Sequence, residues 1–167
     1  AVNAMETAGI FMSVAAGNTG YYGCSTIGDP LAIYVNVMTV GSIDKEGNLS
    51  AFSSLGPVSV DGSGRTKPDL LAPGQEVMAA FPGNQYAEMS GTSLAAPHVT
   101  GVVALMWSAN PDLIGNIELT RMILEDTTTP YAGDFPECVS QTASPNNAAG
   151  YGIVNAFEAV QKALSMK

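Results

Sequence analysis

Short apolar runs alternate with longer helical patterns along this 167-residue chain. The run Gly9–Ala16 is continuous, contains β-branched and aromatic residues, and ends at a Gly-Asn pair, which is typical of a strand buried on both faces. Val35–Ile43 has the same character and predicts a second strand. A Gly-Asn turn signal further on predicts a hairpin between strands Glu76–Ala80 and Gln85–Met89.

Helical patterns occupy most of the remaining ordered sequence. The longest runs from Ser93 to Ala109 and is apolar nearly all round, so we expect a central, buried helix. Shorter helices are predicted over Ile117–Asp126 and Val154–Leu164, and Ala1–Gly9 has the pattern of a helix already under way. Strands alternating with helices predict an α/β fold, a three-layer sandwich with a mainly parallel sheet.

The composition indicates that part of this surface is covered by more protein. Charged residues make up 13% of the chain and hydrophobic residues 46%, whereas about 25% charge is usual in soluble domains. A surface built from Ser, Thr, Asn and Gly is the alternative. Because the chain also starts inside a helical pattern at Ala1, we expect residues 1–167 to be the C-terminal portion of one larger domain.

The charge and the cysteines restrict the partners and the compartment. A net charge of −9 argues against nucleic acid and anionic membranes as partners, and the longest apolar run, Val102–Trp107, is too short to cross a bilayer. Cys24 and Cys138 lack the close spacing of a zinc site. Their turn-rich surroundings favour a disulfide and an oxidising compartment, with two free thiols as the alternative.

Ser93 is the strongest candidate for chemistry. It opens the long apolar helix after a Gly-Thr turn, where unpaired backbone N–H groups can stabilise a developing anion. The only histidine, His98, is five residues further on, which places it about 140° around the helix and roughly 7.5 Å along it. His98 therefore cannot act as the base for Ser93, and we expect a core histidine with its hydrogen bonds satisfied.

The segment around Ser93 resembles Gly-Thr-Ser-x-Ala-x-Pro-His-Val, the nucleophile motif of the subtilisin-like serine proteases (subtilases, peptidase S8). A helix that merely begins with a serine would not require the proline and histidine at these spacings. Four further segments resemble motifs of that family and follow in the family's order: Ser13–Asn18, Ala51–Pro57, Lys67–Gly74 and Tyr151–Ala156.

This resemblance implies a role for individual residues. Ser93 would attack the peptide carbonyl, and the Ser93 backbone N–H and the Asn18 side chain would hold the resulting oxyanion. Gly28 resembles the base of the pocket for the side chain before the cleaved bond, where a small residue leaves room for large apolar side chains. Substrate-binding positions are implied at Ala15, Ala16, Gly17, Gly28 and Ser90.

Metal ions have no part in the implied chemistry. The family's loops corresponding to Asp44 and to Leu31–Tyr34 hold a weakly bound structural cation such as calcium in some members. Their ligands are mostly backbone carbonyls, so no metal-binding residue is assigned. Asp69 lacks the context of the family's catalytic aspartate, and we expect it to brace its own loop.

The family's catalytic aspartate and histidine motifs are absent from this sequence. In the family's chain order both precede the oxyanion asparagine, so we expect them, with the N-terminal strands of the domain, before Ala1. The implied parent is a serine endopeptidase, secreted or in the periplasm or at the cell surface, that hydrolyses polypeptides. The isolated chain would be inactive without its N-terminal part.

Two alternatives belong to other functional classes. One is a pseudoprotease or binding module whose parent also lacks the triad. The other is an assembly piece that pairs with an N-terminal half and has no catalytic role. For the isolated chain, the open edge of the predicted strand Gly9–Ala16 favours self-association with other copies.

Overall fold

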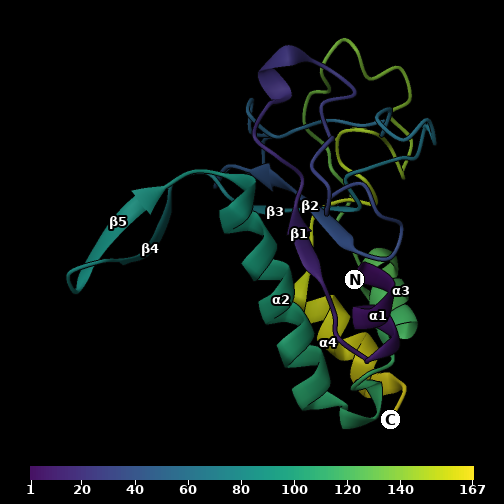
Figure 1. Ribbon diagram of the computed structural model, residues 1–167. Helices are drawn as coiled ribbons and strands as arrows, with labels where there is room; N and C mark the ends of the chain where they lie inside the picture. Colours follow the sequence, from purple (N-terminus) through teal and green to yellow (C-terminus); the bar gives the residue numbers. More distant parts are fainter.

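Three parallel strands form the centre of the computed structural model, which describes residues 1–167 (Figure 1). Their order is β1 (Ser13–Ala15), β2 (Met38–Ile43) and β3 (Leu70–Pro73), and both pairings are parallel. Every residue of β2 is buried, because this strand has a neighbour on each side and packing on both faces. The three-residue β1 lies at one edge of the sheet and is only half-buried.

Helices cover one face of the sheet. The long helix α2 (Thr92–Ala109) contacts all three strands and lies against α4 (Ala156–Ser165), while α3 (Ile117–Asp126) packs beside α4. Buried apolar side chains of β2, β3 and these helices form one core cluster. The short helix α1 (Val2–Thr7) begins the chain.

Loops cover the opposite face, and one of them carries the one-turn 3₁₀ helix η1 (Gly20–Tyr22). A second one-turn 3₁₀ helix, η2 (Pro111–Leu113), follows α2 and packs against α2 and α3. The hairpin of β4 (Val77–Phe81) and β5 (Gln85–Met89) extends away from the body of the molecule (Figure 1). No helix has both the length and the apolar character needed to cross a membrane.

The predicted α/β class and parallel sheet are confirmed, but the boundaries of several strands differ. The first two strands begin at Ser13 and Met38, later than predicted. Val35 lies outside β2 and is 64% exposed, and its carbonyl accepts a hydrogen bond from Arg121. The strand Leu70–Pro73 was not predicted, because the prolines around it are typical of a loop.

The predicted central position of α2 is confirmed by its contacts with all three strands, but the prediction that the helix is buried holds for one face only. One face packs on the sheet and on α4, whereas Pro97, Gly101 and Leu105 on the other face are exposed. The pattern is apolar on both faces, but within this chain only one of them has an element to pack against. Along the exposed face, α2 and β4 line an apolar groove of about 530 Å³.

The prediction of a core position for His98 is wrong for the same reason. His98 lies on the uncovered face of α2 and is exposed, and its Nδ1 forms a 2.9 Å hydrogen bond with the carbonyl oxygen of Leu94. The expected open sheet edge is present at β1, which has a neighbouring strand on one side only.

Candidate active site

Ser93 lies in the first turn of α2, immediately after the chain leaves the β4–β5 hairpin. Ser93 is exposed, and its hydroxyl forms no hydrogen bond within the chain. Its backbone N–H also has no acceptor, as expected for a donor in the first turn of a helix. The serine therefore presents a free hydroxyl and a free N–H at the positive end of the helix dipole.

Gly91 keeps the space beside this hydroxyl open. A Cβ atom added to Gly91 would lie 3.1 Å from Ser93 Oγ and 3.5 Å from Asn18 Nδ2. Both atoms thus border one small volume that any larger side chain would fill. The hydrogen bond from Gly91 N–H to the carbonyl oxygen of Gly74 (2.8 Å) fixes this turn.

Thr92 sets the orientation of the Asn18 amide. Asn18 Oδ1 accepts hydrogen bonds from the Thr92 backbone N–H (2.9 Å) and from Thr92 Oγ1 (3.0 Å), and Thr92 Oγ1 accepts from the Gly17 N–H (3.1 Å). A backbone N–H can only donate, so the oxygen of the amide must face Thr92 and the nitrogen must face away. The Asn18 Nδ2 group is left without a partner, on the side of Gly91 and Ser93.

Two unpaired donors, Asn18 Nδ2 and the Ser93 N–H, therefore lie near one exposed serine hydroxyl. Such a pair of preorganised donors can stabilise the negative charge that develops on a carbonyl oxygen under nucleophilic attack. Asn18 and Ser93 are 75 positions apart in the sequence, and the packing of α2 on β1 brings them together. Sequence reasoning selected both residues but missed Thr92, although it is the middle residue of the Gly-Thr-Ser motif.

The other predicted substrate-binding residues differ in their surroundings. Ala15 ends β1 and is half-buried, whereas Ala16 is 1% exposed and packs in a small core cluster. Gly17 adjoins Asn18, and Gly28 is exposed beside the side chain of Val60. Ser90 is exposed, and its hydroxyl accepts a hydrogen bond from the Glu76 N–H at 2.9 Å.

Nothing in the chain lies in position to take a proton from Ser93. His98 is the only histidine, and its Nδ1 contacts a backbone carbonyl one turn back along α2. No three His, Cys, Asp or Glu side chains gather closely enough to hold a metal ion. The site within this chain consists of an exposed serine hydroxyl and two unpaired N–H donors, with no histidine beside them.

A buried ion pair supports the loop that leads into β3. The Lys67 ammonium donates to Asp69 Oδ2 at 2.5 Å and to the carbonyl oxygen of Val37 at 2.9 Å, and the Thr39 N–H donates to Asp69 Oδ2 at 2.6 Å. Burial lowers the pKa of Lys67, and the Asp69 carboxylate beside it opposes that shift. Asp69 braces this loop, as expected, and ties it to β2.

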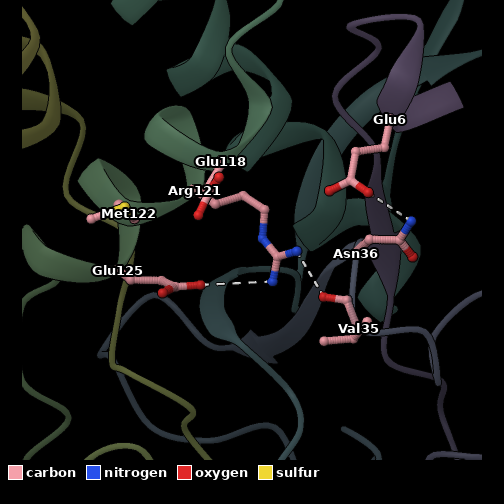
Figure 2. Close-up of a pocket in the computed structure, with 7 residues that line it drawn as sticks. All are labelled: Glu6, Val35, Asn36, Glu118, Arg121, Met122 and Glu125. Carbon is pink, nitrogen blue, oxygen red and sulfur yellow. Dashed lines mark hydrogen bonds and ion pairs between the residues drawn. The ribbon is translucent and has the colours of Figure 1, made fainter. Parts of the chain in front are cut away.

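A polar pocket of about 400 Å³ lies between α1, α3 and the segment before β2 (Figure 2). The Arg121 guanidinium crosses it, donating to the Val35 carbonyl at 2.7 Å and lying 3.9 Å from Glu125. Glu6 accepts a hydrogen bond from Asn36 on the opposite side of the pocket. Its polar groups are largely paired with one another, and none of the predicted catalytic residues lines it.

Two cysteines join the loop after Asn18 to the loop before α4. Cys24 and Cys138 form a disulfide across 114 residues, and neither cysteine is free. The sequence favoured this pairing over two free thiols.

Comparison with known proteins places the chain in a family. The sequence pattern of the subtilase family, peptidase S8, matches residues 1–152, and the chain belongs to this family. It is 38% identical over 164 residues to bacillopeptidase F of Bacillus subtilis, covering 95% of this chain and 11% of that protein. It is 34% identical over 161 residues to subtilisin BL of Lederbergia lenta, covering 96% of this chain and 50% of that protein.

Solved structures agree with the sequence comparison. The patellamide maturation protease PatA superposes with a TM-score of 0.76 at 28% identity, covering 98% of this chain and 55% of that one. The chain therefore spans about half the length of this structure and of subtilisin BL, and a smaller share of bacillopeptidase F.

Proposed function

We propose that this chain provides the nucleophile and the oxyanion hole of a serine endopeptidase. The observation that carries the proposal is the free Ser93 hydroxyl between two unpaired donors, its own N–H and Asn18 Nδ2. Membership of the subtilase family supports the same chemistry. The substrate is a polypeptide, and the bond broken is a peptide bond.

In the proposed reaction, Ser93 Oγ attacks the carbonyl carbon of the peptide bond while a general base removes its proton. The carbonyl oxygen becomes an oxyanion and accepts hydrogen bonds from the Ser93 N–H and Asn18 Nδ2. Collapse of this intermediate expels the amine, which takes up the proton, and leaves an acyl group on Ser93. Water, deprotonated by the same base, then releases the carboxylic acid and regenerates the hydroxyl.

The general base and its aspartate partner come, in this proposal, from another part of the same catalytic domain. The exposed apolar face of α2, the groove beside β4 and the open edge of β1 together form a surface suited to such a part. Its relatives of about twice this length are consistent with that division. In the isolated chain this uncovered surface favours self-association.

We further propose an oxidising compartment, with the protein secreted, periplasmic or at the cell surface. Stable disulfides such as Cys24–Cys138 persist mainly in such compartments. No metal ion has a role in the proposed chemistry, and a structural cation in the loops near Asp44 or Leu31–Tyr34 stays a prediction.

Labelling of Ser93 by a fluorophosphonate probe tests the proposal. In the full-length protein we expect labelling together with peptide hydrolysis, and we expect both to be lost in Ser93→Ala. The isolated chain should not be labelled, because its serine has no base. Labelling of the isolated chain would contradict the requirement for a second part, and absence of both signals in the full-length protein would favour a pseudoprotease.

A further inference from the structure

An acidic side chain lies beside the predicted substrate-binding wall. Asp29 directly follows Gly28, and its Oδ2 lies 3.5 Å from the position that a Cβ atom on Gly17 would occupy. Gly17 in turn precedes Asn18, the proposed oxyanion donor. The Asp29 carboxylate therefore lies near the backbone of the residue that precedes the proposed oxyanion donor.

This carboxylate is unpaired. Asp29 is exposed, and its side chain takes part in no hydrogen bond or ion pair of the structure. Two of the cations have other partners: Arg65 binds Asp61 and the Ile33 carbonyl, and Lys67 is buried against Asp69. An exposed, unneutralised negative charge is thus available to a ligand.

The remaining cations of the chain are also committed or distant. Arg121 lies across the polar pocket against the Val35 carbonyl, and Lys45 lies beside Glu46. Lys162 is in α4 and Lys167 follows it, at the far end of the molecule from η1 (Figure 1). With fifteen acidic residues against six basic ones, the protein as a whole also attracts cationic ligands.

The neighbours of Asp29 on the predicted substrate-binding wall are two glycines and, beside one of them, an exposed valine. Gly17 and Gly28 carry no side chains, and the exposed Val60 lies against Gly28, within 3.3 Å of an added Cβ. Lysine and arginine bury their methylene groups along apolar surface and keep the charged group at a polar end. Arginine adds two parallel hydrogen bonds to a carboxylate.

We infer that Asp29 is a specificity-determining residue that favours a basic residue immediately before the cleaved bond. The inference rests on the proposed endopeptidase function and specifies its substrate class. It also changes the expectation drawn from Gly28 alone, which was a pocket for large apolar side chains. Asp29 selects the substrate and takes no part in the bond-breaking steps.

A set of matched peptides tests this inference in the full-length protein. The peptides are identical except for Arg, Gln, Met or Glu before the cleaved bond, and kcat/KM is measured for each. We expect Arg to exceed Gln by about two- to fivefold at low salt, as for an exposed charge pair. That ratio should shrink as ionic strength rises.

Variants of Asp29 separate its charge from other effects. Asp29→Asn should reduce the Arg/Gln ratio about two- to fivefold, Asp29→Lys should invert the preference toward Glu, and Asp29→Glu should retain the preference for Arg. Asp126→Asn is the matched control, because Asp126 is an exposed acid at the end of α3. This control removes the same unit of charge and should leave the ratio unchanged.

The outcomes distinguish the two proposals. Hydrolysis with an Arg/Gln ratio that Asp29→Asn leaves unchanged overturns the role of Asp29 and retains the endopeptidase. Equal loss of the ratio in Asp126→Asn also overturns it, because the effect is then one of net charge. Absence of hydrolysis of every peptide, with no fluorophosphonate labelling of Ser93, overturns the endopeptidase itself. Should Asp29→Asn fold poorly, Asp29→Glu and Asp29→Lys carry the test.

Discussion

The two polar clusters at the ends of the sheet strands have opposite states of hydrogen bonding. At the start of α2, Ser93 Oγ, the Ser93 N–H and Asn18 Nδ2 are exposed and unpaired. At the start of β3, Lys67 and Asp69 are buried and bonded to each other and to the backbone. Both clusters lie within short sequence motifs, but only the first has unpaired polar groups that can bind a ligand.

This difference separates groups that can interact with a substrate from groups that stabilise the fold. An unpaired buried charge costs several kcal/mol, so the groups at β3 must be satisfied within the chain for the fold to form. Donors at a solvent-exposed helix terminus are satisfied by water and can be exchanged for a substrate oxyanion. Substitutions in the first cluster should therefore change the rate, and those in the second the stability.

The largest effect on stability is expected from Lys67→Met. The variant keeps a side chain of similar length but leaves Asp69 buried without its cation, which should lower the free energy of unfolding by about 3–5 kcal/mol. Urea unfolding of the full-length protein measures this change, in a Ser93→Ala background to prevent self-digestion.

Lys45→Met is the control for that substitution. Lys45 forms a 3.8 Å ion pair with Glu46 in which both side chains are well exposed, and the unfolding free energy should stay within about 0.5 kcal/mol. A loss as large as that of Lys67→Met would show that burial of the pair is not the cause.

The largest effect on rate apart from the nucleophile itself is expected from Asn18→Ala. Removal of one oxyanion donor should reduce kcat about 10²–10³-fold, the effect known for a subtilisin of this family, with little change in KM. Steady-state kinetics of the full-length protein measure it. Asn48→Ala, which alters an exposed turn, should leave kcat unchanged, and an unchanged kcat in Asn18→Ala would remove Asn18 from the mechanism.

Thr92→Val tests whether orientation of the Asn18 amide matters. The valine removes one of two hydrogen bonds to Asn18 Oδ1 and leaves the Gly17 N–H unpaired, so kcat should fall about tenfold, equivalent to roughly 1.4 kcal/mol. Thr100→Val, which removes a hydroxyl contact within the same helix, should not change kcat. Thr92→Ser should restore most of the rate.

Local signals in the sequence were sufficient for some elements. The helix α3 begins and ends where predicted, because its apolar stripe is clear and Asn116 caps it by accepting from the Leu119 N–H. The hairpin of β4 and β5 was predicted within one residue, since its turn is marked by Gly83-Asn84. Such features depend on neighbours only a few residues apart.

Features that depend on distant contacts could not be predicted in the same way. The contact of Thr92 with Asn18 joins residues 74 apart, and no periodicity marks it. The strand at Leu70 becomes regular only by pairing with β2. The apolar pattern of α2 correctly indicates two apolar faces, but whether each face is covered depends on elements outside the helix.

The smallest predicted effect concerns Glu125, a half-buried acid that interacts with the charges of Lys67 and Asp69. Burial raises the pKa of Glu125, although the Arg121 charge opposes the shift. Because the folded-state pKa lies above the unfolded one, Glu125 contributes stability that is full below the unfolded pKa and is lost as pH rises through the folded pKa. Glu125→Gln should therefore flatten the decline of the unfolding free energy between acidic and neutral pH.

Urea midpoints at a series of pH values, again in the Ser93→Ala background, measure the change. Glu118→Gln is the control on the same helix, since Glu118 is an exposed acid in its first turn. A steeper decline in Glu125→Gln would mean that attraction to Arg121 outweighs burial, and that this half-buried acid belongs with the satisfied ion pair at β3.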